Sequence, residues 1–198
     1  MSSFYFWHWR ICVLMRLNKG AFLDCSNLTN IIIPDTITKI EDRAFYGCSG
    51  LIEITIPDSL ISIGQYAFKD CISLTNITIP NSVINIHGSA FSNCRSLTNI
   101  SIPDSTTSIG WNTFEGCVNL ESIIMSRSVT YIGAYAFWGC YLSKIYYKGT
   151  ADDFKKITVE MYNSGLRDAT KYYYSETKPT EAGDYWHYDT DGVTPVIW

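Results

Sequence analysis

Apolar residues recur through most of the chain at a fixed step of 23 residues. Within each repeat, polar residues mostly separate neighbouring apolar positions, and this alternation is typical of a half-buried β-strand. A step of about 20 to 50 residues indicates repeats that stack on one another. The two inward columns of the predicted strand are Ile31, Ile54, Ile77, Ile100 and Ile123, followed by Ile33, Ile56, Ile79, Ile102 and Met125.

Further columns follow this strand in each repeat. Proline stands directly after it in four repeats, and ends it because proline donates no ladder hydrogen bond. The next stretch, for example 58–64, is predicted to form a turn and a second short extended segment. An Ala-Phe-x-x-Cys pattern then predicts a tight, buried corner. Its cysteines are Cys25, Cys48, Cys71, Cys94, Cys117 and Cys140.

A single repeat buries too little apolar surface to offset the entropy lost on ordering its backbone, so the repeats must stack and share one core. We predict a mainly β repeat solenoid at 14–147, a right-handed coil of about six 23-residue turns. An irregular segment is expected at 1–13 and a small α+β cap at 148–198. Leu14 and Leu17 stand 23 residues before Ile37 and Ile40, which favours the hypothesis that the chain is a truncated or mis-started piece of a longer protein.

The segment after the last repeat carries helix and hairpin signals. Thr150 followed by Asp152 and Asp153 predicts a helix N-terminus, with Phe154 and Ile157 on its buried side. Extended segments are expected at 171–175 and 184–188. The second is joined through an Asp-Gly turn to 193–198, a pattern that indicates a hairpin. Such a cap would cover the open last coil of the solenoid.

The cysteine column is interpreted as a stack of reduced, buried thiols. Equivalent side chains in adjacent coils repeat at the strand spacing of ~4.8 Å. A disulfide needs Cβ atoms ~3.8 Å apart. A zinc site is disfavoured because the column has no Cys-x-x-Cys pair and no histidine beside it.

Composition and charge narrow the possible functions. The net charge of −4 and a pI near 5.3 do not favour nucleic acid as a partner. No apolar run is long enough for membrane insertion, and no signal peptide is visible. His8, His87 and His187 lie far apart in the chain, and no catalytic or phosphate-binding motif accompanies them. We therefore expect no enzymatic activity and no cofactor.

The columns Leu-x-x-Ile-x-Ile-Pro and Ile-Gly-x-x-Ala-Phe-x-x-Cys resemble the BspA-type leucine-rich repeat over roughly 14–147. One residue is missing from the last repeat, at Tyr141-Leu142. The segments 146–150, 172–175, 185–188 and 195–198 resemble the closing segment of gut-bacterial members. The resemblance implies a leucine-rich-repeat fold, a cell-surface or secreted location, and adhesion to an extracellular matrix protein such as fibronectin or fibrinogen. It implies no catalytic residue.

Two outward columns flank the isoleucines of the first strand and form the candidate partner-binding face. A polar ladder could equally serve only to solvate the sheet or to bond one coil to the next. With few aromatic or arginine anchors, the face is expected to be flat, continuous and weakly binding. The columns are Asn30, Glu53, Asn76, Asn99 and Ser122, and Ile32, Thr55, Thr78, Ser101 and Ile124.

The aromatic C-terminal segment supports an alternative function, glycan or cell-wall binding. Its candidate contacts are Tyr185, Trp186, Tyr188 and Trp198. Packing within the cap would account for the same residues. A calcium loop at Asp189-x-Asp191-Gly192 is disfavoured, because its bidentate acidic ligand would fall beyond Trp198.

Overall fold

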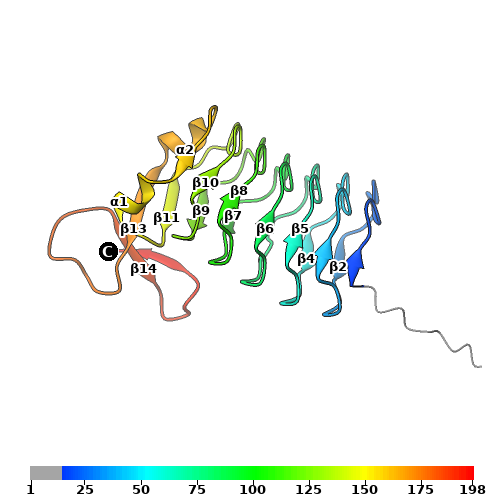
Figure 1. Ribbon diagram of the computed structural model, residues 1–198, viewed down its shortest axis with the longest axis horizontal. Coiled ribbons are helices and arrows are strands. Elements are labelled where there is room, and N and C mark those ends of the chain that lie inside the picture. The colour runs from blue at the N-terminus through cyan, green and yellow to red at the C-terminus, as the bar shows by residue number, and fades with distance from the viewer. Residues whose placement is uncertain (1–14) are drawn as a thin grey trace, which may run out of the picture.

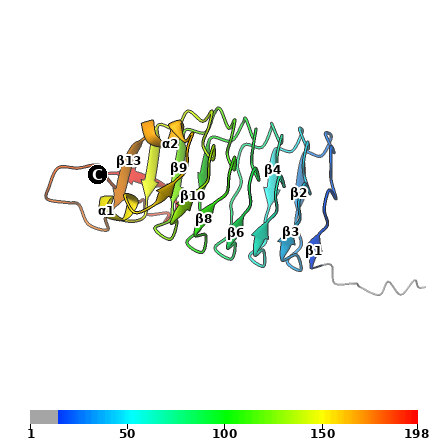
Figure 2. The same ribbon diagram turned by 45° about the horizontal axis from the view of Figure 1, so that its top comes forward.

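The computed structural model describes residues 15–198, so the irregular segment expected at 1–13 lies outside the described residues. Successive coils stack along one axis, with helices and a hairpin at the C-terminal end (Figures 1 and 2). The mainly β leucine-rich-repeat solenoid predicted from the sequence is confirmed. Within residues 15–198, no helix is both long enough and apolar enough to cross a membrane.

Most coils contribute two short strands, one to each side of the solenoid. The strands on the first side are β2 (Asn30–Ile32), β4 (Glu53–Thr55), β7 (Asn99–Ser101), β9 (Ser122–Met125), β11 (Lys144–Tyr147) and β13 (Thr170–Tyr174). The strands on the second side are β1 (Arg16–Leu17), β3 (Lys39–Ile40), β5 (Ser62–Ile63), β6 (Asn85–Ile86), β8 (Ser108–Ile109), β10 (Tyr131–Ile132) and β12 (Thr158–Val159). These correspond to the two extended segments expected in each repeat.

The second side forms the longer sheet. Its seven strands pair in parallel in the order β1-β3-β5-β6-β8-β10-β12, and Ile40, for example, stands opposite Ile63. On the first side, β2 and β4 form one sheet, while β7, β9, β11 and β13 form another with the hairpin strands β14 (Tyr185–Tyr188) and β15 (Pro195–Ile197).

The first side was expected to be one continuous sheet, and this expectation is wrong at the coil of Asn76. That coil makes only an isolated bridge, between Asn76 and Glu53. Its Ile77 and Ile79 are nevertheless buried. The apolar–polar alternation is thus sufficient to bury the isoleucines. It does not fix the alignment of neighbouring strands closely enough to form every ladder hydrogen bond.

Phenylalanine rings form the centre of the core. Neighbouring rings stack from Phe22 to Phe137 with centroids 5.1 to 5.6 Å apart. The leucine, cysteine and isoleucine columns surround this stack and are almost entirely buried from Phe45 onward. Phe22, in the first described coil, is partly buried and packs against this core.

The corner of each coil passes through the left-handed region of φ at two positions. One column is Arg43, Tyr66, Ser89, Asn112 and Tyr135, and the other is Gly47, Asp70, Asn93, Gly116 and Gly139. The second column consists only of Gly, Asn and Asp, which tolerate this conformation best. These paired reversals turn the chain around the Ala-Phe core positions and direct it to the next strand.

The solenoid continues past residue 147, where the sequence placed its end. β12 adds to the seven-stranded sheet beside β10, and β13 pairs with β11. The predicted helix is present as α1 (Ala151–Phe154), and the Thr150 hydroxyl accepts a hydrogen bond from the Asp153 amide. A second helix, α2 (Ser164–Asp168), leads into β13. The region predicted as a separate cap therefore begins with one more coil, in which helices replace the usual turns.

Candidate binding surface

The outward columns of the first side lie at the surface as predicted. Asn30 stands opposite Glu53 in the first short sheet, and Asn99 stands opposite Ser122 in the second. Eight of the ten predicted residues are exposed, and Ser122 and Ile124 are half-buried. The most exposed apolar residue of the set is Ile32, at 77 %. The ten side chains therefore share one side of the solenoid, although the sheet beneath them is interrupted.

The face is not flat throughout, because the C-terminal hairpin lies beside its last coils. A hollow of about 690 Å³ separates the hairpin from the strands. Thr78, Ser101 and Ile124 line it on the solenoid side, and Tyr188 and Val193 line it on the hairpin side. The expectation of a uniformly flat surface is therefore wrong at the C-terminal end of the face. We refer to this space between face and hairpin as the hairpin hollow.

The hairpin turn is braced by its own aspartates. The Asp191 carboxylate accepts hydrogen bonds from the amides of Val193 and Thr194, each at 2.8 Å, and from the Thr194 hydroxyl. These hydrogen bonds hold the pKa of the Asp191 carboxyl below its usual value, and the bonds from Thr194 have the largest effect. The amide of Asp189 also donates to the Thr194 carbonyl at 2.8 Å. The Asp-x-Asp-Gly sequence thus forms the hairpin turn predicted for it, and its Asp191 carboxylate is used within the turn.

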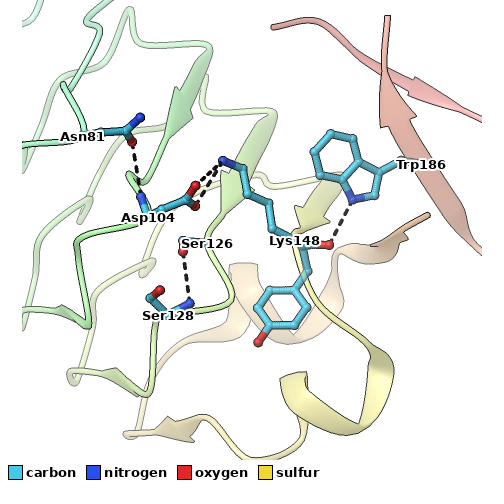
Figure 3. Close-up of polar contacts among 7 residues, drawn as sticks. Asn81, Asp104, Ser126, Ser128, Lys148 and Trp186 are labelled. Atoms are coloured by element: carbon cyan, nitrogen blue, oxygen red, sulfur yellow. Dashed lines mark hydrogen bonds and ion pairs between the residues drawn. The ribbon is translucent and has the colours of Figure 1, made fainter. Parts of the chain in front are cut away.

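Lys148 lies at the edge of the hollow, where it bonds to Asp104 of the solenoid (Figure 3) and lies against the Tyr188 ring of the hairpin. Its Nζ donates to the Asp104 carboxylate at 3.1 and 3.3 Å, and lies 5.6 Å from the centre of the Tyr188 ring. Burial by itself lowers the pKa of Lys148, but hydrogen bonding to Tyr188 and Asp104 outweighs it and raises that pKa. The ammonium therefore remains charged and links Asp104 of the solenoid to the Tyr188 ring of the hairpin.

The aromatic tail is divided between core and surface. Trp186 is fully buried, and its indole N–H donates to the Tyr147 carbonyl at 3.0 Å (Figure 3). The sequence-based proposal of Trp186 as a glycan contact is therefore wrong, because no face of its ring is accessible. Tyr185 and Tyr188 are half-buried. Trp198 is 40 % exposed, and its ring stacks on His187 with centroids 3.8 Å apart.

The first-side face and the hairpin hollow together form a surface that a macromolecular partner could contact. Within residues 15–198, no group of three or more His, Cys, Asp or Glu side chains is placed to hold a metal ion. The predicted face presents hydroxyl, amide and short apolar groups instead, and the hairpin hollow adds one aromatic wall and one lysine. Such groups can form hydrogen bonds and van der Waals contacts with a macromolecular partner.

Sequence reasoning missed the hairpin's share of this site. Lys148, Val193, Thr194 and Pro195 all line the hollow, and none was predicted to contact a partner. The Asp-Gly turn signalled a hairpin at this position in the chain. Where the hairpin packs depends on Trp186, which donates to the Tyr147 carbonyl 39 residues away in sequence, and on Lys148, whose ammonium lies against the Tyr188 ring.

A solenoid of stacked parallel coils with an exposed polar strand face is the architecture of a leucine-rich-repeat protein. The chain belongs to the BspA-type leucine-rich repeat family, whose repeat model matches residues 15–161 in six copies. This class of repeat is typically non-enzymatic and serves as a protein-interaction or surface module. No curated protein matches the chain significantly.

Solved structures of bacterial leucine-rich-repeat proteins resemble the chain. A leucine-rich cell surface protein from Faecalibacterium prausnitzii is 29% identical with a TM-score of 0.69, over 89% of this chain and 47% of that one. This chain thus spans about half the length of that protein. A leucine-rich repeat protein from T. pallidum is 29% identical with a TM-score of 0.60, over 73% and 68% of the two chains. The pneumococcal vaccine antigen PcpA, 22% identical over 74% and 36% with a TM-score of 0.60, shares the fold.

Proposed function

We propose that this chain is a non-enzymatic adhesion module, displayed at a bacterial cell surface or secreted, that binds a protein partner through the first-side face and the hairpin hollow. An extracellular matrix protein such as fibronectin or fibrinogen is the proposed partner. Family membership and the cell-surface relative from F. prausnitzii support the location and the class of activity.

The observation that carries the proposal is the hairpin hollow. A flat polar face alone offers a partner little desolvated contact, because binding energy concentrates where side chains enter enclosed positions. The hollow supplies such a position, with Ile124 and Val193 as apolar contacts and Thr78 and Ser101 as polar ones. An extended segment of the partner could lie across the exposed face and insert one side chain between the strands and the hairpin.

The proposal is tested by measuring binding of the full chain to immobilised fibronectin and fibrinogen. Thr78→Arg and Ser101→Arg each place a long, charged side chain in the hollow, and Thr55→Arg does so on the exposed face beyond it. Thr107→Arg is the matched control, since Thr107 is an exposed threonine next to β8 on the second side.

We expect saturable binding to at least one matrix protein. In the Thr78 and Ser101 variants, the arginine should occupy the hollow and exclude the partner's side chain. The affinity for the matrix protein should then fall at least roughly tenfold, which corresponds to ~1.4 kcal/mol. The Thr55 variant should be affected less and the Thr107 control not at all. Unchanged affinity in both hollow variants would remove the face as the binding site. Saturable binding to polysaccharide alone would transfer the function to glycan recognition.

A further inference from the structure

A second hollow lies on the other side of the solenoid, along the seven-stranded sheet. It has a volume of about 420 Å³ and draws residues from four consecutive coils. Its lining is largely polar and shares no residue with the hairpin hollow. The side chains that define it are Lys39, Glu41, Asp42, Gln65, His87 and Trp111.

Two glycines interrupt the outward columns along the hollow. Gly64 occupies the position of Glu41 and His87 in its own coil, and Gly88 occupies the position of Asp42. A Cβ atom on Gly64 would come within 2.6 Å of the Asp42 backbone nitrogen, which is too close for any side chain. Gly64 therefore lets the coil of Asp42 pack closely against it, and only its backbone lines the hollow there.

Trp111 forms one wall and is held in position from below. A Cβ atom on Gly88 would lie 2.6 Å from both Cε2 and Nε1 of the indole and 2.9 Å from Cδ2. Similar distances to three ring atoms place Gly88 beneath the face of the ring. Tyr66 packs edge-on against the indole with centroids 5.8 Å apart, and Trp111 remains 44 % exposed. The ring is therefore a supported aromatic platform at the surface.

Polar groups of both charge signs surround this platform. The Asp42 Oδ1 accepts a hydrogen bond from the Gln65 amide at 2.8 Å, which orients the carboxylate. Glu41 lies 3.7 Å from Arg16 in an exposed ion pair, and Lys39 and His87 complete the rim. This mixture favours neither an anion such as phosphate nor a cation, and it is too polar to favour an apolar peptide.

We infer that this hollow is a carbohydrate-binding site for a neutral oligosaccharide. One sugar ring stacks its C–H face on Trp111, while carboxylate and amide groups bind its hydroxyls. A pyranose unit is about as long as the ~4.8 Å spacing of adjacent strands. An oligosaccharide aligned with the solenoid axis can therefore meet equivalent positions on successive coils. The site is independent of the proposed protein-binding face.

The test is calorimetric titration of the full chain with oligosaccharides derived from chitin, cellulose, xylan and mannan. Trp111→Ala removes the platform. Gly88→Ala keeps the indole but displaces it, because the added methyl group would overlap the ring. Trp138→Ala is the matched control, since Trp138 is 50 % exposed and lies outside this hollow.

We expect at least one of these oligosaccharides to bind, with affinity reduced at least roughly tenfold by Trp111→Ala, less by Gly88→Ala, and unchanged by Trp138→Ala. Fibronectin or fibrinogen binding should be the same in Trp111→Ala as in the wild type. Binding of none of the panel would overturn the inference. So would binding that survives Trp111→Ala, including binding abolished by Trp198→Ala, which would place the site in the C-terminal segment.

Discussion

At the scale of single residues, the cysteines of the corner column bond one coil to the next. Each thiol from Cys48 to Cys140 donates to the carbonyl of the phenylalanine in the preceding coil, at 3.0 to 3.2 Å. The Phe45 carbonyl, for example, accepts both the Cys48 amide and the Cys71 thiol. Cysteine combines a small apolar volume with this weak donor, and both properties suit a buried corner.

Burial of these thiols predicts a loss of stability at alkaline pH. Burial raises the pKa of Cys48 to about 11 and that of Cys140 to about 12, from the ordinary 9.0. Because the folded pKa exceeds the unfolded one, the stabilisation is complete below pH 9 and is lost as the pH rises toward 11. The melting temperature should therefore be level between pH 7 and about 8.5 and fall above about pH 9.

The variant Cys48→Ala tests whether a buried thiol contributes to this fall in melting temperature. Cys48→Ala should melt lower than the wild type at pH 7, because it lacks the hydrogen bond and leaves a small void. Its melting temperature should then decline less steeply between pH 9 and 11. Equal slopes in the two proteins would show that Cys48 does not contribute to the alkaline transition.

Among the elements, the corner of the last 23-residue repeat is closed by one buried side chain, where earlier corners meet the backbone of the next repeat. In earlier coils the amide of each core phenylalanine donates to a carbonyl of the next coil, as Phe114 does to Ala136. Phe137 instead donates to the Asn163 Oδ1 at 2.9 Å. The Asn163 amide nitrogen in turn donates to the carbonyls of Gly133 and Glu160.

Asn163→Ala should therefore loosen the C-terminal end of the solenoid. It leaves the buried Phe137 amide and the Gly133 carbonyl without these partners, at a cost of about 1–3 kcal/mol. The measurement is urea unfolding followed by circular dichroism, with Asn119→Ala as the control. Asn119 is an exposed asparagine that donates to the Arg95 carbonyl, so its loss should cost much less. A similar effect of both substitutions would rule out a closing role for Asn163.

Strands, helices and turns that depend on residues close together in sequence could be predicted. How the C-terminal elements pack against the solenoid could not. The strand columns, the helix after Thr150 and the Asp-Gly hairpin follow from spacing and capping along the chain. The extra coil beyond residue 147 was missed because helices replace the repeat's turns there and shift the step from 23 residues. Burial of Trp186 and the position of the hairpin depend on contacts distant in sequence, which periodicity does not encode.

As a whole molecule, the protein stacks its coils along one axis, with strands on two sides (Figure 2). The first-side face ends in the hairpin hollow, and the seven-stranded sheet carries the Trp111 hollow. The ten residues of the outward columns lie on one side of the solenoid, because a repeat of constant length places equivalent residues there, and their role in binding stays a prediction. The enclosed end of this face could not be predicted, since the hairpin that encloses it lies outside the repeat pattern.

The most direct test of partner binding through the hairpin hollow is hydroxyl-radical footprinting of the chain with and without bound matrix protein. The account predicts that Tyr188, Val193 and Ile124 become protected from oxidation on binding. Exposed residues elsewhere, such as Trp138 and Tyr141, should be oxidised to the same extent in both states. Protection of Trp138 or Tyr141 with no change at Tyr188 and Val193 would contradict the account and move the interface away from the first-side face.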